Sequence, residues 1–233
     1  VVDLRNTTDF YRIEINKGVD DTYIVEITAD DPTFFNLYGF ANEGLDSPQL
    51  TVNDNALGLI FGTVKVGNNV TVSPLNASGN YSVFEGARIW VDGGTVEKTA
   101  GTAIVPYGKI RVSAGLLNAP INSGITTRDN GQVTIEGGTA TGNQFRTSIN
   151  GVSAQGGLVM TGGIFNITGG STNSDFYVFS LTYSGNVFNM SGGTINLSGA
   201  NSKGSIYINS SDENINVTGG TVNFDVTNGN NAV

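Results

Sequence analysis

Apolar and polar residues follow a phrase that recurs six times between residues 87 and 223. Each copy has two apolar residues separated by one variable residue, then a corner of small residues, then a second short apolar stretch. Aligned on the second small residue, the anchor positions are spaced by 21, 23, 25, 30 and 27 residues; they are Gly94, Gly115, Gly138, Gly163, Gly193 and Gly220. A period in the twenties is typical of stacked units that bury their apolar faces only against one another.

The repeat predicts which side chains point into a core. Five and three residues before the anchor, every copy is apolar: Ile89, Ile110, Val133, Leu158, Phe188 and Ile215, then Val91, Val112, Ile135, Met160, Met190 and Val217. The residues between them are mixed, which is the alternation of a half-buried strand. Two residues after the anchor stand Val96, Leu117, Ala140, Phe165, Ile195 and Val222, which should also point inward. From three residues before the anchor to two residues after it is a step of five, an odd number, so an unbent strand would place these two sets on opposite faces. Both sets can face one core only if the chain bends at the corner, where glycine adopts positive φ without steric cost.

Each repeat is therefore expected to contain a strand, a corner, a second strand and a variable loop. Stacked in parallel, such units predict an all-β fold, a right-handed parallel β-helix, because parallel crossovers are right-handed in nearly all proteins. A helical solenoid is disfavoured, because the apolar spacing is not helical and the chain is rich in Gly, Asn and Thr.

The two ends of the chain differ in composition. Residues 1–55 are acidic and contain alternating stretches such as Tyr23–Ile27, and we interpret them as irregular first coils or an N-terminal cap. Residues 56–233 are assigned to the β-helix. The last strong repeat is followed by no capping pattern, so we expect the β-helix to continue, or to be covered, beyond Val233.

Composition limits the partners and the chemistry. With 20 acidic and 11 basic residues the net charge is −9, which disfavours nucleic acid as a partner. No apolar run approaches the ~20 residues of a membrane span, so no membrane insertion is expected. The chain has neither Cys nor His, which removes disulfides, thiolate metal sites and the commonest catalytic base.

Carboxylates in the repeat region are too sparse to indicate a catalytic pair. Asp92 and Glu136 share the position two before the anchor, but Ser113 occupies it in the coil between them. At one coil spacing each, the two carboxylates would lie ~10 Å apart, beyond the usual separation of a glycosidase acid and base. We therefore expect no enzymatic activity.

One candidate metal site precedes the repeats. Asp20, Asp21, Asp30 and Asp31 form two acidic pairs whose oxygens suit Ca²⁺. Adjacent acids in turns are more often simply solvated, and no Asp-x-Asp-x-Asp-Gly loop or nonapeptide calcium repeat occurs. We expect no cofactor, with Ca²⁺ at these pairs as the less favoured alternative.

A column of asparagines and one tryptophan are the candidate ligand-binding residues. Three residues after the anchor stand Asn118, Asn166, Asn196 and Asn223, at positions that alternation places outward. Stacked amides can bond coil to coil, or form a polar face that docks a glycan or another surface. Trp90 is also outward, where it can stack on a sugar or be covered by a neighbouring loop.

The Gly-Gly-Thr-apolar-Asn phrases at residues 192–196 and 219–223 resemble bacterial secreted right-handed parallel β-helix proteins. Autotransporter passenger domains and filamentous-haemagglutinin-like adhesins are the nearest in style, over roughly residues 60–233. The resemblance implies export to the cell surface, a rod-like stalk, and contact with a host or neighbouring cell, its glycans included. It thus favours a non-enzymatic structural or adhesive segment of a larger secreted surface protein, with the rest of the polypeptide beyond both ends. The alternative is a glycan-binding or glycan-active (hydrolase- or lyase-like) β-helix module.

Overall fold

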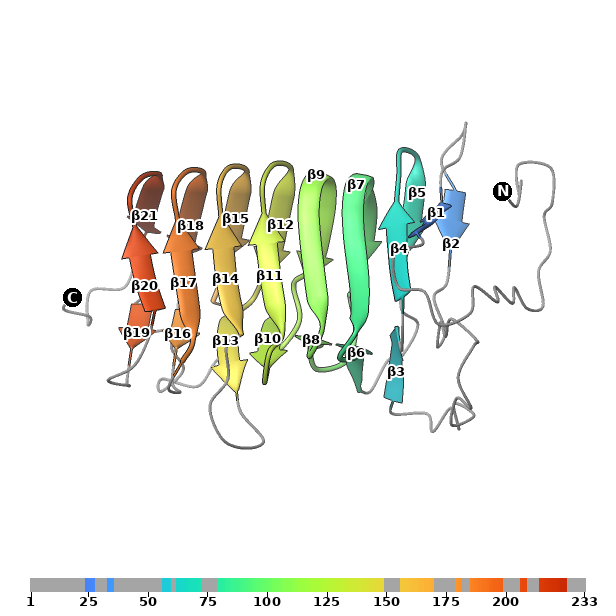
Figure 1. Cartoon of the computed structure of the whole chain (residues 1–233), viewed down its shortest axis with the longest axis horizontal. Helices are drawn as coiled ribbons and strands as arrows, with labels where there is room; N and C mark the ends of the chain where they lie inside the picture. Colours follow the sequence, from blue (N-terminus) through green and yellow to red (C-terminus); the bar gives the residue numbers. More distant parts are fainter. Residues whose placement is uncertain are drawn as a thin grey trace.

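The chain forms a parallel β-solenoid of about five turns, in which successive coils lie side by side along one axis (Figure 1). The computed structural model describes residues 24–27, 33–35, 56–59, 62–72, 79–148, 156–169, 179–181, 185–198, 206–208 and 214–225. These residues contain strands and no helix. The predicted all-β parallel β-helix is thereby confirmed.

The strands form three parallel rows. The first row contains β1 (Ile24–Ile27), β4 (Gly62–Val66), the first halves of β7 (Ala87–Glu97) and β9 (Lys109–Ala119), then β11 (Gln132–Ile135), β14 (Gly157–Met160), β17 (Val187–Met190) and β20 (Asn214–Val217). The second row contains β2 (Thr33–Phe35), β5 (Val70–Val72), the second halves of β7 and β9, then β12 (Thr139–Gly142), β15 (Ile164–Ile167), β18 (Thr194–Ser198) and β21 (Thr221–Asp225). These two rows form one 14-stranded sheet.

A third row lies in what the sequence predicted to be a variable loop, so that prediction was incomplete. Its strands are β3 (Ala56–Leu59), β6 (Asn80–Val83), β8 (Ile104–Pro106), β10 (Ile125–Arg128), β13 (Phe145–Ser148), β16 (Phe179–Leu181) and β19 (Ile206–Ile208). They are three or four residues long and stand at varying distances from the corner glycines. No fixed spacing therefore identified them.

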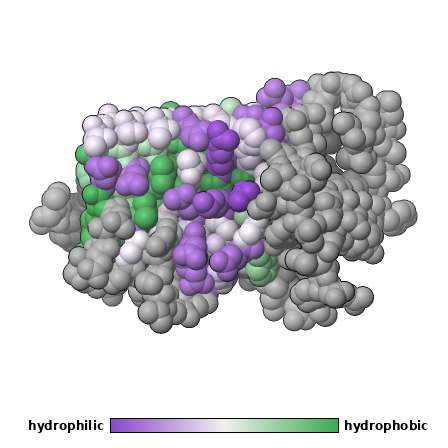
Figure 2. Space-filling view, in the orientation of Figure 1, coloured by the Kyte–Doolittle hydropathy of each residue, from purple (hydrophilic) through white to green (hydrophobic). Residues whose placement is uncertain are grey.

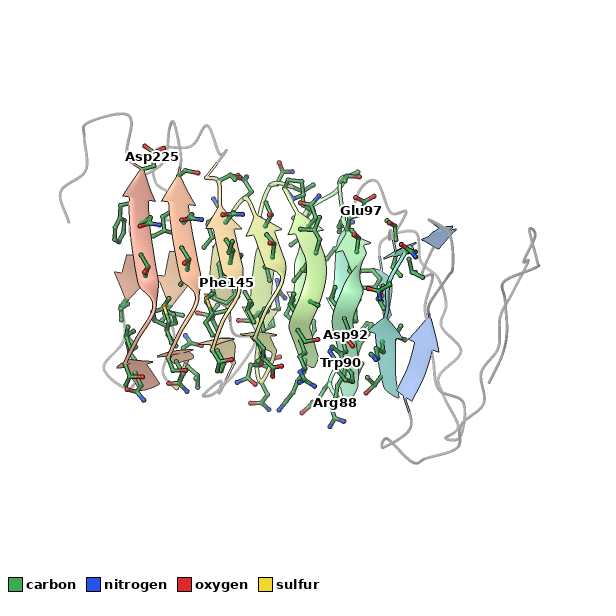
Figure 3. The ribbon with its side chains drawn as sticks, turned by 90° about the horizontal axis from the view of Figure 1, so that it is seen from above. Arg88, Trp90, Asp92, Glu97, Phe145 and Asp225 are labelled. Carbon is green, nitrogen blue, oxygen red and sulfur yellow. The ribbon has the colours of Figure 1, made fainter. Side chains whose placement is uncertain are left out.

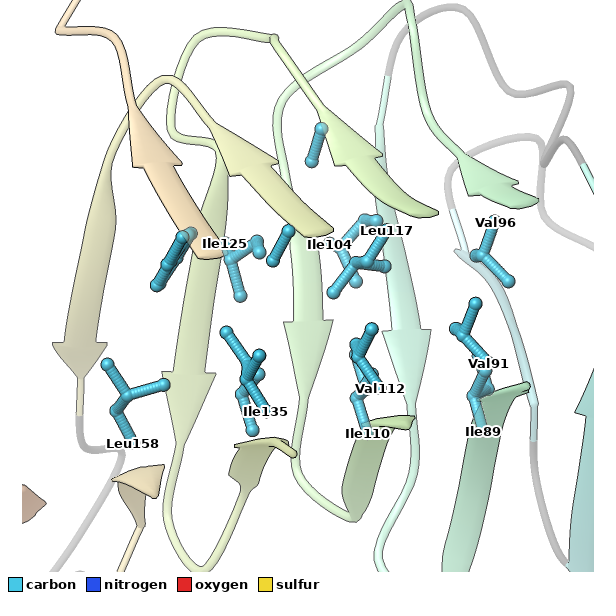
Figure 4. Packing of buried hydrophobic residues seen from close by; sticks show 14 of the residues in the cluster. Ile89, Val91, Val96, Ile104, Ile110, Val112, Leu117, Ile125, Ile135 and Leu158 are labelled. Carbon is cyan, nitrogen blue, oxygen red and sulfur yellow. The ribbon is translucent and has the colours of Figure 1, made fainter. Parts of the chain in front are cut away.

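Strand register confirms the alignment of the repeats. Ile135 pairs with Met160, Met160 with Met190, and Met190 with Val217. The first three of these side chains are buried, as predicted, whereas Val217 is exposed at the C-terminal end of the stack. The inward columns meet across a continuous apolar interior (Figure 4). Phe145 of the third row packs edge-on against Phe165 of the second row, with ring centroids 5.7 Å apart.

The bend between the first and second rows depends on glycine. Gly163 has a φ of +70°, and a Cβ there would lie 2.8 Å from the carbonyl oxygen of Gly137 in the neighbouring coil. A side chain would therefore both strain the backbone and separate the coils. In the coil of β7 the positive φ falls on Gly93, one residue before the anchor, and the register between β7 and β9 is irregular at this corner.

One inward column contains a lysine. Four residues after the anchor, where Ile167 and Leu197 fill the later coils, the first coil has Lys98, and its side chain is fully buried. Burial lowers the pKa of the Lys98 ammonium from its ordinary value. The small residues Ala119 and Gly142 occupy the same position in the next two coils and are register partners of each other.

Two strands lie within the predicted N-terminal cap. β1 pairs in parallel with β4 and β2 with β5, so these segments extend the first two rows. The alternating stretch Tyr23–Ile27 thus contains the strand it predicted. The other residues of the predicted cap, Asp20, Asp21, Asp30 and Asp31 among them, lie outside the described residues.

Candidate functional site

Trp90 lies between two cations on the outward face of the first row. Lys65, Trp90 and Arg111 are register partners on β4, β7 and β9. The ammonium of Lys65 lies 4.8 Å and the guanidinium carbon of Arg111 4.5 Å from the ring centroid. Because β4 and β9 flank β7 on opposite sides, the cations approach the ring from both sides along the axis. The ring thus contacts its neighbours by cation–π interactions instead of offering a free face.

The indole also belongs to a polar network. Trp90 Nε1 donates to Ser113 Oγ at 2.6 Å, and Ser113 Oγ donates to Asp92 Oδ1 at 2.7 Å. Lys65 Nζ lies 3.0 Å from Asp92 Oδ2. The Ser113 hydrogen bond, followed by that of Lys65, lowers the pKa of Asp92 from its ordinary value. This carboxylate is held ionised, and it contacts side chains of the coils on both sides of its own.

Glu136 is engaged by a different cation. Arg111 donates to Glu136 Oε2 from Nε at 2.9 Å and from Nη2 at 2.7 Å. The two carboxylates that share the position two before the anchor are therefore each paired with a cation. A general acid needs a raised pKa, and the pKa of Asp92 is shifted the other way. The arrangement consequently fits a structural ion-pair network better than an acid–base pair.

Aromatic residues line the edge where the third row turns into the first row. Phe84 and Tyr107 stack across neighbouring coils with ring centroids 6.3 Å apart and an interplanar angle of 8°. Arg128 Nη1 donates to Tyr107 Oη at 3.4 Å, and Arg128 Nε is buried without a hydrogen-bond partner. Phe84 is exposed. Sequence reasoning missed this edge, although the signal was an aromatic residue shortly before the first strand of two successive repeats.

The asparagine column holds the second row together. Asn196 Nδ2 donates to Asn166 Oδ1, and Asn223 Nδ2 donates to Asn196 Oδ1, each at 2.8 Å. Asn118 stands in the same column, but Thr141 separates it from Asn166. Three of the four predicted residues thus form a ladder along the axis.

An open depression of about 450 Å³ lies at the corner between the second and third rows. It is lined by Thr99, Ala100, Pro120, Ile121, Asn122 and Asn143, among others. Asn143 Nδ2 donates to the backbone oxygen of Asn122 at 3.0 Å, and Asn122 Nδ2 to that of Gly101 at 3.4 Å. The lining amides therefore also bond coil to coil.

The predicted ligand-binding residues do not converge on one site. Trp90 faces outward from the first row, whereas the asparagine ladder lies on the second row. Asp92 and Trp90 project together from β7, and Glu97 and Asp225 lie on the other side of the stack (Figure 3). Among the described residues, no group of three or more Asp and Glu could hold a metal ion. Nor does that part of the chain contain a helix that could span a membrane.

Comparisons with protein-family models, with curated proteins and with solved structures find no match for this chain.

Proposed function

We propose that the chain is a rod-like, non-enzymatic segment of a larger secreted bacterial surface protein, a stalk or a surface-contact module outside the cell. The observation that carries the proposal is that outward side chains of the first and second rows contact the same position in the neighbouring coil. The Lys65–Trp90–Arg111 column and the Asn166–Asn196–Asn223 ladder both bond one coil to the next. Such contacts stiffen a stack along its axis, which is what a stalk requires.

Surface contact would fall mainly on the coils of residues 62–148. Six Lys and Arg residues whose side chains are not buried lie there, and Figure 2 shows hydrophilic residues gathered over the middle coils. Lys109 is exposed, so this cation can meet an anionic group on another surface. The proposed partner is the surface of a host or neighbouring cell, its glycans included.

A glycan-binding module is the second candidate, and the Phe84–Tyr107–Arg128 edge is the observation that favours it. Aromatic edges beside a guanidinium suit the apolar and polar sides of a sugar. This candidate differs from the first in needing one localised site instead of a uniform rod.

One experiment on the full chain separates these functions. Beads coated with the chain are tested for adhesion to cells and to a panel of immobilised polysaccharides, and the supernatant is assayed for new reducing or unsaturated sugar ends. We expect adhesion without release of sugar ends. Loss of adhesion to one polysaccharide in Arg128→Ala, with adhesion kept in Arg128→Lys, would favour the glycan-binding module.

One result would contradict the proposal, and a second would narrow it. Release of sugar ends that disappears in Asp92→Asn or Glu136→Gln would make the chain an enzyme. Absence of adhesion to every surface would exclude the surface-contact role. The stalk role would then be tested separately, by measuring with small-angle scattering whether the chain keeps the length of a rigid rod in solution.

A further inference from the structure

The inward columns are open at the C-terminal end of the solenoid. Ile208, Ile215, Val217 and Phe224 are 43%, 40%, 53% and 48% exposed. Each follows a buried member of its column in the preceding coil; these members are Leu181, Phe188, Met190 and Leu197. Figure 2 shows hydrophobic residues along this end. The end therefore presents a cross-section of the core instead of a polar surface.

The backbone at this end is also unpaired on one side. Within the part of the chain that the structure describes, β19 pairs only with β16, β20 only with β17, and β21 only with β18. Three short strand edges thus present free N–H and C=O groups next to the exposed apolar columns.

The hydrogen bonds of the asparagine ladder all run in one direction along the axis. Each amide donates from Nδ2 to the Oδ1 of the preceding coil, as Asn223 does to Asn196 and Asn196 to Asn166. No described residue donates to Asn223 Oδ1. A strand that continues the ladder must therefore offer an amide donor at the position next to Asn223.

We propose that this end is a docking edge for a segment carrying another copy of the repeat phrase, bound in parallel and in register. Its occupant has apolar residues five and three before a glycine corner and two and four after it, with Asn three after it. A second copy of the chain docked end to end by a two-fold axis fits less well. A two-fold axis would pair β21 of one copy antiparallel with β21 of the other. The two asparagine ladders would then run in opposite directions, and each would present an Asn223 Oδ1 acceptor to the other. The inference is independent of the proposed function.

The occupant can be represented by the chain's own residues 185–198, which contain β17, the glycine corner and β18. This peptide, made synthetically, is added to the full chain, and backbone hydrogen exchange is followed by mass spectrometry. We expect exchange in residues 214–225 to slow about tenfold or more, while exchange in residues 158–167 stays unchanged. A peptide with Phe188 and Ile195 replaced by Asn is the control ligand and should give no protection.

Variants of the full chain test the surface itself. Val217→Lys and Phe224→Lys should abolish the protection, because each places a charge in an apolar column. Ile164→Lys is the matched control, since Ile164 is 41% exposed but lies on β15, which is paired with a strand on both sides. Asn223→Ala should weaken peptide binding about fivefold, the worth of one hydrogen bond.

Disulfide trapping tests the register, because the chain has no cysteine of its own. Asn216→Cys in the full chain should form a disulfide with the peptide carrying Cys in place of Asn189, and not with the peptide carrying Cys in place of Asn196. Disulfide-linked dimers of the Asn216→Cys chain in place of the peptide adduct would assign the edge to a second copy and overturn the proposal. So would an absence of both protection and trapping.

Discussion

Two parts of the solenoid share one apolar interior and differ on their outward columns. In the coils of residues 62–148, cations, carboxylates and Trp90 bond one coil to the next. In the coils of residues 156–225, the Asn166–Asn196–Asn223 ladder takes this role, and the described residues there include no Lys or Arg. The repeat phrase thus keeps the inward columns five and three before and two after the anchor apolar in every copy, whereas two different chemistries satisfy the outward columns.

The largest expected effect concerns the shared interior. Met190→Asp in the second part and Val112→Asp in the first should each cost about 4 kcal/mol or more, because an unpaired charge would enter an apolar column. Val217→Asp is the matched control, since this side chain is half exposed, and it should cost far less. Urea unfolding followed by circular dichroism measures all three. Similar losses for Met190→Asp and Val217→Asp would contradict the assigned columns.

The second effect concerns the corner that both parts use. Gly193 has a φ of +86°, and a Cβ there would lie 2.5 Å from the carbonyl oxygen of Gly162. Gly193→Ala should therefore cost about 1–3 kcal/mol. Gly142→Ala is the control, because its φ is not positive and the nearest atom to its Cβ would be 3.2 Å away. The thermal midpoints of the two variants should differ, and equal midpoints would show that the corner tolerates a side chain.

The third effect belongs to the first part alone and concerns Lys98. Desolvation lowers its pKa in the folded state, so its charged form destabilises the fold at neutral pH. Lys98→Met should stabilise the protein by about 1 kcal/mol at pH 7. As pH rises from the lowered pKa of Lys98 to its unfolded pKa of about 10.4, this advantage should disappear. Urea titrations at pH 7 and pH 11 measure it, and an advantage that persists at pH 11 would exclude titration of Lys98 as its cause.

The smallest effect compares the two outward chemistries directly. Asp92→Asn should cost at most about 1 kcal/mol, because the ion pair is partly solvated, and the cost should shrink in high salt. The cost of Asn196→Ala should not depend on salt. Since the pKa of Asp92 is lowered in the folded state, its stabilisation is complete above about pH 4 and is lost as pH falls through the folded pKa. Salt-independent losses in both variants would remove the distinction between the parts.

Much of the fold was predictable because the buried residues of the first and second rows stand at constant distances in sequence from the corner glycines. The offsets of Ile135, Met160 and Met190 from their corner glycines match the observed strand register. The third row was not predictable, because strands such as β8 and β10 are short and their distances from the corner vary. Burial of Lys98 was not predictable for another reason: its position is inward, but a lysine ammonium is costly to desolvate and is seldom found in an apolar column.

The candidate site was less predictable than the fold. Alternation correctly placed Trp90 outward, yet its contacts with Lys65 and Arg111 come from coils more than twenty residues away in either direction. The asparagine ladder was predictable, because identical residues recur at one offset. The Phe84–Tyr107–Arg128 edge was not, since Phe84 and Arg128 stand ten residues before their anchors but Tyr107 only eight, and the three side chains meet only through the turn.

The spacing between anchors varies from 21 to 30 residues, yet from β9 onward the strands of the first and second rows keep one register with their neighbours. Additional residues are absorbed between the strands and leave the stacking distance unchanged. Tandem duplication of one repeat within the gene would therefore lengthen the rod by ~4.8 Å without altering the contacts of the other coils. The length of the rod is then set by the number of repeats in the gene. Selection can change that length one coil at a time, while the outward side chains of each row evolve separately.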